Sequence, residues 1–599
     1  MDLLPKVFRT EGNITGFDSS RIYESLLKET GLTEKDSARI TELVVRRIIK
    51  YGIKFLSGPH IREIICSILS EQHFENERKL YTRIGMPLMD YEEILEKRSN
   101  EMMINPEKIH HMAANKIAEE YSHLRLLSNE ESKAHLAGDI HINGLNYFDS
   151  RPFNQTWDLR FLLKMGLPLI NNNSSFCKVR AANNLREAIY DMIKWVTMTQ
   201  SEFYGIQGFE FITIYLAPYI RGLSDTKIKS ILKYLICEIN RLTVIIGREI
   251  PSLFISSTPS ILKELTELPA ITPGGIIKGT YRDYSIECLK LFKAITFVYK
   301  EESKFIKSFK TPKHKILWDS SFMNENSEMF SYVWDEIQTT NNSYLINFEN
   351  KKFRKKKFEH ISNTGSSNTG VLQNICLNLP RFVYMSQNED EFFEVLNDKI
   401  DLCLEIFSKK YEIIKNRIKS KHLPICGSSS NGDPIFDLVN QKCTISFIGL
   451  TEVVKFLTNY HLHENLDSFS LGVKIVRNMK EMCSKLSDGK KSYVLSENLS
   501  YHALKRFSKL DLKHFKPFIE KLNVEKIGDI YSNSFHFKSD TEIELYDKIK
   551  KQGEFHQLIQ VGACEQISLH ELKKNNISLH DLMNRVIKDA NLIQLKFGR

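Results

Sequence analysis

The segment Thr369-Gly370-Val371-Leu372-Gln373, which leads through an apolar run into Asn378-Leu379-Pro380-Arg381, decides the fold of this 599-residue chain. The surrounding run Ile375–Tyr384 is short and rich in apolar and aromatic side chains, which is typical of a buried β-strand. Comparable runs occur at Gly138–Ile142, Phe211–Tyr215 and Ile445–Ile448. Each of them predicts one strand of a central sheet.

Long amphipathic helices are predicted between these apolar runs. Their apolar residues recur with helical spacing, and polar residues fill the remaining positions. The predicted helices cover about residues 107–125, 180–204, 225–247, 283–307, 388–420 and 466–486. This alternation of helices and strands favours an α/β body built around a central sheet.

The N-terminal part of the chain is predicted to form a separate, small helical domain. A chain of 599 residues exceeds what one hydrophobic core normally supports, so a small and a large domain are expected. Helices are predicted at Arg21–Thr30, Glu34–Tyr51, Gly58–Gln72 and Glu77–Ile84. Pro87 cannot continue a helix and ends this bundle. We therefore place the small domain at residues 1–95 and the large domain at residues 105–599.

The composition is that of an ordinary globular protein, with 42% apolar residues, 26% charged residues and a formal charge of +9. No run approaches the roughly 20 apolar residues that cross a bilayer, and no signal peptide is visible, so we expect a cytoplasmic protein without a membrane partner.

The ten cysteines stand singly without a Cys-x2-Cys pair, which indicates neither zinc nor a disulfide framework. His135 and His141 lack the helical spacing of a metal-binding pair, so no metal site is predicted.

One run of basic residues is dense enough to contact phosphates. It consists of Lys351, Lys352, Arg354, Lys355, Lys356 and Lys357, interrupted by Phe353. Such a block can displace counterions and hold the phosphates of a nucleic acid. The alternative interpretation is a solvated loop in a lysine-rich protein.

The N-terminal segment carries a pattern that suits a nucleotide phosphate. A glycine turn between two short strands, followed by the start of a helix, offers backbone N–H groups, and Arg9 and Arg21 offer cations. The pattern resembles the start of an ATP-cone, a nucleotide-sensing domain, over about residues 4–95. The resemblance implies ATP or dATP as an allosteric ligand, although Thr10 and Cys66 depart from the family's pattern. The candidate nucleotide-binding residues are Val7, Arg9, Thr10, Gly12, Phe17, Asp18 and Arg21.

Four segments of the large domain together resemble the anaerobic, class III glycyl-radical ribonucleoside-triphosphate reductases. They are Ala134–Ile142 with Arg151–Phe153, Gly205–Gly208 with Leu216–Tyr219, Thr369–Gln373 with Asn378–Arg381, and Gly449–Glu452 with Val561–Ala563. Their order and spacing behind an ATP-cone carry the resemblance, which covers roughly the whole chain. It implies a ten-stranded α/β barrel, and a homodimer as in the reductases is a candidate assembly.

The resemblance also implies chemical parts that this sequence lacks. The family's thiyl cysteine lies upstream of the Asn-Leu-Pro-Arg strand, where Phe358–Asn363 holds no cysteine, and a second cysteine follows Arg-Pro-Phe, where Asn154 stands. The family's radical glycine and four-cysteine zinc site follow a strand that the last residues of this chain resemble, so we expect neither zinc nor a glycyl radical. Cys376 and Glu452 remain candidate catalytic residues, with Cys443 as a further candidate thiol.

Three functions are compatible with these observations. The leading hypothesis is a non-catalytic relative of the reductases that binds ATP or dATP and acts in regulation or on a protein partner. The second is an active ribonucleoside-triphosphate reductase that makes deoxyribonucleotides for DNA synthesis, with the radical supplied by another polypeptide. The third is a nucleic-acid- or protein-binding scaffold that uses the basic run Lys351–Lys357. Sites rather than folds decide among them.

Overall fold

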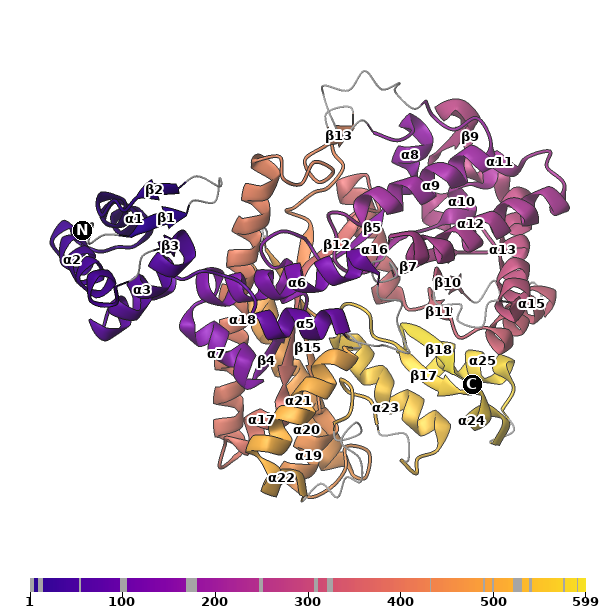
Figure 1. Ribbon diagram of the computed structural model, residues 1–599. Coiled ribbons are helices and arrows are strands. Elements are labelled where there is room, and N and C mark those ends of the chain that lie inside the picture. Colours follow the sequence, from indigo (N-terminus) through magenta and orange to yellow (C-terminus); the bar gives the residue numbers. More distant parts are fainter. Residues whose placement is uncertain are drawn as a thin grey trace. The chain divides into compact units, whose positions relative to one another are not determined.

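The structure is a computed structural model of the chain. It describes residues 5–8, 14–52, 55–96, 105–168, 180–246, 252–305, 311–319, 327–430, 433–487, 491–497, 500–520, 531–537, 541–574, 577–589 and 591–598. The chain divides into two compact units, one of Met1–Met102 with Ile109–Asn129 and the other of Met103–Lys108 with Glu130–Arg599. Figure 1 shows the elements of both units, coloured along the sequence.

The first unit combines a three-stranded sheet with a group of helices. Its strands are β1 (Lys6–Phe8), β2 (Ile14–Gly16) and β3 (Phe55–Ser57), and β1 lies between an antiparallel β2 and a parallel β3. Its helices are α1 (Ser20–Glu29), α2 (Glu34–Lys50), α3 (Gly58–Glu71), α4 (Glu75–Tyr81), α5 (Leu88–Glu96) and α6 (Pro106–Tyr121). Ile40, Val44 and Ile48 recur every four residues along one face of α2 and are fully buried in the core of this unit.

The ends of these helices follow from local sequence signals. Thr33 caps α2, because its side chain accepts a hydrogen bond of 3.1 Å from the backbone N–H of Asp36.

Helix α6 belongs to the first unit, where Lys116 pairs with Asp90 at 3.3 Å. The first unit therefore extends beyond residue 95, the end that we assign to the small domain from the sequence.

The second unit is built around an eleven-stranded sheet. Ten strands follow one another in the order β16-β15-β12-β5-β6-β7-β10-β11-β18-β17, and β4 pairs additionally with β12. The strands are β4 (Ile140–Ile142), β5 (Asn154–Trp157), β6 (Gln207–Phe209), β7 (Leu253–Ser257), β10 (Lys313–Trp318), β11 (Ser343–Asn347), β12 (Thr369–Asn378), β15 (Gln441–Ile448), β16 (Ser492–Leu495), β17 (Glu565–Ser568) and β18 (Gln594–Gly598).

Backbone hydrogen bonds join the two ends of this sheet. The N–H of Val561, just before β17, donates to the carbonyl of Leu495 in β16 at 3.2 Å, and the N–H of Glu497 donates to the carbonyl of Val561 at 2.9 Å. The ten-stranded path therefore closes on itself as a barrel. This confirms the α/β class and the barrel expected from the sequence.

The barrel consists of two parallel halves. Strands β5, β6, β7, β10 and β11 are parallel to one another, and so are β12, β15 and β16 and, separately, β17 and β18. The halves meet in antiparallel pairs, β5 with β12 and β11 with β18. In Figure 1 the first half appears in purple to pink shades and the second half mostly in orange to yellow.

Helices connect the strands and confirm the long helices predicted from the sequence. The helices are α7 (Asn129–Ala137), α8 (Leu159–Met165), α9 (Leu185–Thr199), α10 (Ile212–Tyr215), α11 (Ala217–Ile220), α12 (Asp225–Ile246), α13 (Ser285–Phe305), α15 (Ser327–Thr339), α16 (Lys351–Thr364), α17 (Leu379–Tyr384), α18 (Glu389–Lys419), α19 (Leu450–Thr458), α20 (Leu466–Lys485), α21 (Tyr501–His514), α22 (Lys516–Glu520), α23 (Leu545–Leu558), α24 (Leu569–Lys574) and α25 (Leu579–Asp589). Among the described helices, none joins sufficient length with sufficient apolarity to cross a membrane. A small hairpin, β8 (Pro269–Thr272) and β9 (Ile276–Thr280), lies outside the barrel sheet.

Three local predictions were wrong. The run Ile375–Tyr384 is a strand only up to Asn378, where β12 ends, and Leu379–Tyr384 forms α17, with Pro380 in its first turn. The run Phe211–Tyr215 is not a strand, because Phe211 has a left-handed backbone (φ 55°) that turns the chain into α10, and the strand β6 precedes it. The basic run is not a loop but the first half of α16. That helix is capped at its start, where the side chain of Asn350 accepts a hydrogen bond from Phe353 N–H, and at its end by Gly365 at φ 68°.

The Asn-Leu-Pro-Arg motif has a structural role at the end of β12. Asn378 donates to Asp511 at 2.8 Å and to the carbonyl of Gly138 at 3.0 Å. Arg381 donates to the same carboxylate of Asp511 at 2.7 Å. Gly449 is required beside this motif, because its φ is 76° and a Cβ there would overlap Pro380. The motif thus fixes how the β12 end, the β15 end and helix α21 meet.

Candidate functional site

The interior of the barrel contains a polar cavity of about 350 Å³. Its volume lies within the range of roughly 300–1,000 Å³ in which small ligands usually bind. Residues from all ten strands of the closed path, or from the segments next to them, line it. The charged and amide-bearing lining residues are Asn154, Gln155, Glu210, Lys313, Lys315, Asn374, Lys442, Glu497, Gln566, Gln594 and Lys596.

Four lysines of the cavity come from three strands. Lys313 and Lys315 of β10 are two residues apart and share the inner face of that strand, while Lys596 belongs to β18 and Lys442 to β15. The ammonium groups of Lys313 and Lys596 lie 5.8 and 5.6 Å from the centre of the Tyr344 ring. None of the four lysines forms an ion pair within the described part of the chain.

Burial of these lysines disfavours their charged form. It lowers the pKa of Lys315 to about 8, although the Glu210 carboxylate favours the ammonium. Burial and the neighbouring Lys356 and Lys357 lower the pKa of Lys442 to about 8 as well. The pKa of Lys313 is lowered by burial and by Lys596. The cavity is therefore an electropositive site that lacks sufficient negative charge of its own.

Both carboxylates of the cavity are already paired. Glu210 accepts a hydrogen bond of 2.6 Å from Lys357 of α16. Glu497 faces the Nε2 atom of His536 at 2.8 Å and accepts a hydrogen bond from the Cys564 N–H, also at 2.8 Å. Neither carboxylate forms an ion pair with the four lysines among the described residues, although Glu210 favours the charged form of Lys315 and Lys442.

His536 carries a positive charge beside the cavity. Its second ring nitrogen faces the side-chain oxygen of Gln552 at 3.0 Å, so both nitrogens meet acceptors. Burial opposes protonation, but the Glu497 carboxylate outweighs it, and the pKa of His536 is raised to about 9. Burial raises the pKa of the neighbouring Glu565 carboxyl to about 7.

Among the described residues that line the cavity, Cys564 is the one with a thiol. Burial and the Glu497 carboxylate raise the pKa of this thiol well above its usual value. Cys376 and Cys443, the thiols singled out from the sequence, do not line the cavity, and burial raises the pKa of each to about 12. Asn154 does line it, with its side-chain oxygen held by the Ile206 N–H at 2.7 Å.

Glu452, the second catalytic candidate from the sequence, lies at the start of α19 away from the cavity lining. Its carboxylate accepts hydrogen bonds from the backbone N–H and the hydroxyl of Ser532, at 3.0 and 2.7 Å. These contacts fix the segment around Ser532 to the helix start. The geometry thus gives Glu452 a structural role outside the lining of the barrel cavity.

The basic run of α16 does not form one uniform surface. Arg354 binds Glu264 through two hydrogen bonds of 2.7 and 2.8 Å, and Lys357 binds Glu210 of the cavity. The remaining lysines of the run are exposed, namely Lys351, Lys352, Lys355 and Lys356. Part of the run therefore faces solvent and part faces the barrel.

The nucleotide candidates of the first unit are only partly described. Val7 belongs to β1, and Phe17 packs against the core of this unit. Asp18 accepts a hydrogen bond of 3.1 Å from the Ser20 N–H and lies 3.4 Å from Arg21 at the start of α1. The other candidates, Arg9, Thr10 and Gly12, lie outside the described residues.

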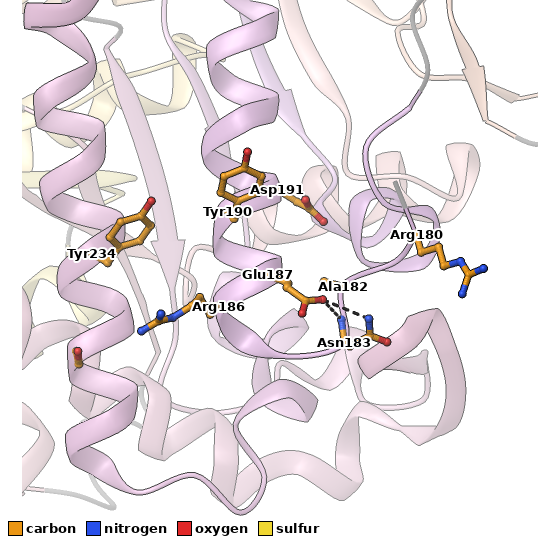
Figure 2. Close-up of a pocket in the computed structure, with 9 residues that line it drawn as sticks. Arg180, Ala182, Asn183, Arg186, Glu187, Tyr190, Asp191 and Tyr234 are labelled. Carbon is orange, nitrogen blue, oxygen red and sulfur yellow. Dashed lines mark hydrogen bonds between the residues drawn. The ribbon is translucent and has the colours of Figure 1, made fainter. Parts of the chain in front are cut away.

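A second cavity, of about 710 Å³, lies beside α9 and α12 of the second unit. Figure 2 shows Tyr190 of α9 and Tyr234 of α12 at this pocket, with Arg186 extending from α9 toward α12. Glu187 accepts a hydrogen bond of 2.8 Å from the Asn183 N–H, and burial raises the pKa of the Asp191 carboxyl to about 6. Arginines can hold phosphates and aromatic rings can stack on bases, so this pocket has the groups that a nucleotide needs.

The histidines singled out from the sequence pack against each other. The rings of His135 and His141 are stacked with their centres 5.4 Å apart, and His502 lies 5.3 Å from His141. Burial, Arg506 and His502 lower the pKa of His141 to about 3. Among the described residues, no group of three or more histidine, cysteine or acidic side chains is arranged to hold a metal ion.

The lysines of the cavity are the functional candidates that the sequence analysis missed. Their signal was present, because Lys313 and Lys315 lie two residues apart at the start of β10, and Lys596 stands between Leu595 and Phe597 in β18. Charged residues at alternating positions of a central strand indicate a polar barrel interior. Recognising this required knowing that 313–318 and 594–598 are barrel strands.

Comparison with known proteins agrees with this geometry. The family model for anaerobic ribonucleoside-triphosphate reductase matches residues 98–598. The enzyme of that name from Haemophilus influenzae is 24% identical over 37% of this chain and 32% of its own length, so the matched part spans about a third of that relative. The Escherichia coli enzyme is 20% identical over 97% of this chain and 88% of its own length. The crystal structure of the Thermotoga maritima anaerobic ribonucleotide reductase with dATP in the specificity site has a TM-score of 0.68 at 16% identity, covering 89% of this chain and 91% of that one. By its closed barrel, its ordered motifs and the family match over 98–598, this chain belongs to the anaerobic ribonucleoside-triphosphate reductase family.

Proposed function

We propose that this chain is a nucleotide-binding member of the family that does not itself carry out radical reduction. The observation that carries the proposal is the chemistry of the barrel cavity. Among its described lining residues, four are lysines and one is a cysteine. The cavity thus favours anion binding over sulfur-based radical chemistry.

Thiyl chemistry needs an oxidisable sulfur at the substrate, and the two places that the family resemblance assigns to cysteine hold none here. At the first, Asn154 contributes an amide whose oxygen is bound to the Ile206 N–H. At the second, between β11 and β12, the chain forms α16, and residues 348–368 contain no cysteine. Lys357 of that helix pairs with Glu210 at the cavity. An amide and an ammonium–carboxylate pair do not form a thiyl radical.

Nucleotide binding is supported in each unit. The first unit has two short strands followed by a helix start with Arg21, the arrangement that an ATP-cone uses for phosphates. In the second unit, Arg186, Tyr190 and Tyr234 surround the pocket beside α9 and α12. The Thermotoga maritima neighbour binds dATP in its specificity site. ATP or dATP is therefore the proposed ligand, with its binding transmitted to a partner protein or to a second copy of the chain.

The test is calorimetric titration of the full chain with ATP and dATP, together with an anaerobic reductase assay. We expect nucleotide binding that weakens on Arg21→Ser or Arg186→Ser but not on the control Arg46→Ser, a residue of the exposed Arg46–Glu42 pair. We expect no deoxynucleotide product in the presence of an activating enzyme. Absence of any nucleotide binding, or formation of product, refutes the proposal.

A second candidate function, active reduction with the radical supplied by another polypeptide, is favoured by one observation. Cys564 lines the cavity, although its raised pKa keeps the thiol protonated. If the chain does form deoxynucleotides, Cys564→Ser should abolish the reaction, whereas Cys376→Ser should leave it intact because Cys376 does not line the cavity. Loss of product on Cys376→Ser instead would exclude Cys564 as the reacting sulfur.

A further inference from the structure

We propose that the exposed face of helix α16 binds the phosphate backbone of a double-stranded nucleic acid. This face carries four lysines of the basic run, Lys351, Lys352, Lys355 and Lys356. None of these four lysines lines the barrel cavity or the α9–α12 pocket. The inference therefore goes beyond the proposed function and does not depend on it.

Helical spacing places the four lysines on one side of α16. Lys351 and Lys355 are four residues apart, and so are Lys352 and Lys356, so the members of each pair are neighbours on the helix surface. All four side chains are exposed, whereas Phe358 of the opposite side is buried. The exposed face thus presents four ammonium groups within two helical turns.

Contacts on the inner side of α16 fix the direction of this face. Arg354 binds Glu264 through two hydrogen bonds of 2.7 and 2.8 Å, and Lys357 binds Glu210 at 2.6 Å. The start of the helix is fixed as well, because Asn350 caps it. A preformed array of charges loses little conformational freedom when a ligand binds. The exposed lysines are therefore presented on a fixed support.

The exposed face has an excess of positive charge. Lys355 pairs with Glu359 at 3.6 Å, on the same face. Lys351, Lys352 and Lys356 form no ion pair within the part of the chain that the structure describes. One acid therefore stands against four cations, and the inner basic residues, which are paired, do not share this excess.

Helix α20 extends the positive charge beyond α16. Partial burial, Lys352 and the exposed Arg477 lower the pKa of Lys480, which also donates to the carbonyl of Gln557 at 3.1 Å. Partial burial and Lys480 lower the pKa of Lys356. Like charges this close repel one another, and a polyanion lying across both helices relieves that repulsion. We call the four exposed lysines of α16, with Arg477 and Lys480, the basic surface.

The composition of the exposed face favours a nucleic acid over an acidic protein. Protein docking sites usually have an apolar or aromatic anchor at their centre. Every exposed residue of α16 is instead polar or charged, namely Lys351, Lys352, Lys355, Lys356, Glu359, Ser362, Asn363 and Thr364. Lysine, serine, threonine and asparagine are residues that contact the sugar–phosphate backbone. Unpaired bases need aromatic rings on which to stack, and this face offers none among its exposed residues, which favours a duplex.

The experiment measures binding of the full chain to a fluorescein-labelled DNA duplex of about 20 base pairs by fluorescence anisotropy, between 50 and 200 mM salt. Each neutralised phosphate contributes about 0.9 to the slope of log affinity against log salt. About five contacts from the basic surface give a slope of about −4.5, which is a loss of affinity on the order of 500-fold over this range.

The test variant is the double substitution Lys352→Gln with Lys356→Gln, because glutamine keeps the helix and removes the charge. It should weaken binding at 50 mM salt at least about tenfold and make the slope shallower by about 2. The matched control is Lys505→Gln with Lys509→Gln on α21, an exposed lysine pair with the same spacing. Helix α21 follows the end of β16, whereas α16 precedes the start of β12, which runs in the same direction. The control should bind the duplex as wild type does.

A second measurement does not depend on the folding of variants. Lysine acetylation of wild type is mapped by mass spectrometry with and without the duplex. The duplex should protect Lys352 and Lys356, whereas Lys505 and Lys509 should react at the same rate in both samples. Equal labelling of the α16 lysines with and without the duplex overturns the inference.

Competition experiments identify the kind of polyanion. Unlabelled duplex should displace the labelled duplex, and polyglutamate of the same charge should compete much less well. Equal competition by polyglutamate means that the basic surface recognises acidic protein, and the inference then fails. A single strand of the same sequence should also compete less well than the duplex, and equal or better competition refutes duplex recognition.

The outcomes separate this inference from the proposed function. Saturating ATP should leave duplex binding intact, and displacement of the duplex by ATP would assign the lysines to a nucleotide site and overturn the inference. If ATP binds but the duplex does not, the inference fails and the proposed function stands. If the duplex binds with the expected salt dependence and no nucleotide binds, the proposed function fails and the inference stands.

Discussion

Replacing His536 by glutamine should change the way in which stability depends on pH. His536 lies between Glu497 at 2.8 Å and Gln552 at 3.0 Å, and 15% of its side chain is exposed. Its pKa is about 9 in the folded chain, against an ordinary value of 6.5. Because the folded pKa is raised, the stabilisation is complete below pH 6.5 and is lost as the pH rises toward 9.

The size of this effect follows from the shift. A rise from 6.5 to about 9, at about 1.4 kcal/mol per pH unit, corresponds to roughly 3 kcal/mol at pH 6. His536→Gln should therefore lower the free energy of unfolding by about 3 kcal/mol at pH 6 and by much less at pH 9. Glu565 makes the free energy of unfolding fall with rising pH in the same way, but at lower pH. Its pKa is raised from 4.5 to about 7 in the folded chain, so the folded state favours its protonated form.

The assay is urea-induced unfolding of the full chain at pH 6, 7.5 and 9, followed by tryptophan fluorescence. The control is His422→Gln, because His422 is exposed and bonded to Ser420 at its own turn. Wild type and the control should lose about 3 kcal/mol more stability between pH 6 and 9 than the His536 variant, which keeps only the pH dependence due to Glu565. An unchanged pH dependence in His536→Gln would show that the Glu497 pair does not hold the imidazolium.

Three further predictions concern separate parts of the chain. Leu26→Ala should destabilise the first unit by about 2–5 kcal/mol, because Leu26 is fully buried there. The amides of α1 and α2 should then exchange hydrogen faster, and an unchanged exchange rate would contradict this prediction. Glu336→Ala should destabilise the second unit by about 3 kcal/mol, because the buried ring of His314 loses the carboxylate that lies 2.8 Å from its Nδ1 atom. A melting temperature equal to that of wild type would refute this prediction. Asn154→Cys should place a thiol at the cavity without creating reductase activity, and product formation would contradict the need for a second sulfur.

The sequence predicted the parts of the fold that depend on local patterns. The long helices have continuous amphipathic spacing, so α12, α18 and α20 were placed to within a few residues. Strand β6 was missed because it spans only Gln207–Phe209, while the apolar run that follows it begins with a left-handed residue, Phe211. A short apolar run does not reveal which side of a turn it lies on.

The cavity was harder to predict than the barrel around it. Cys376 and Cys443 were plausible thiols because they lie near the Asn-Leu-Pro-Arg and Gly-Leu-Thr-Glu segments, but neither lines the cavity. Cys564 does, although it lies almost 190 residues after Cys376 in the sequence. Which side of a strand faces the interior depends on register, and register is set by pairings between distant segments.

The pairing of β11 with β18 has a consequence for how the chain is made. Leu345 and Leu595 are register partners, so 250 residues of synthesis separate the two strands. At roughly 5–20 residues per second, β11 waits about 12 to 50 s on the ribosome for this neighbour. Until then its edge presents unpaired backbone groups to other chains. Newly made protein should therefore depend on a chaperone that shields the edge of β11 during translation.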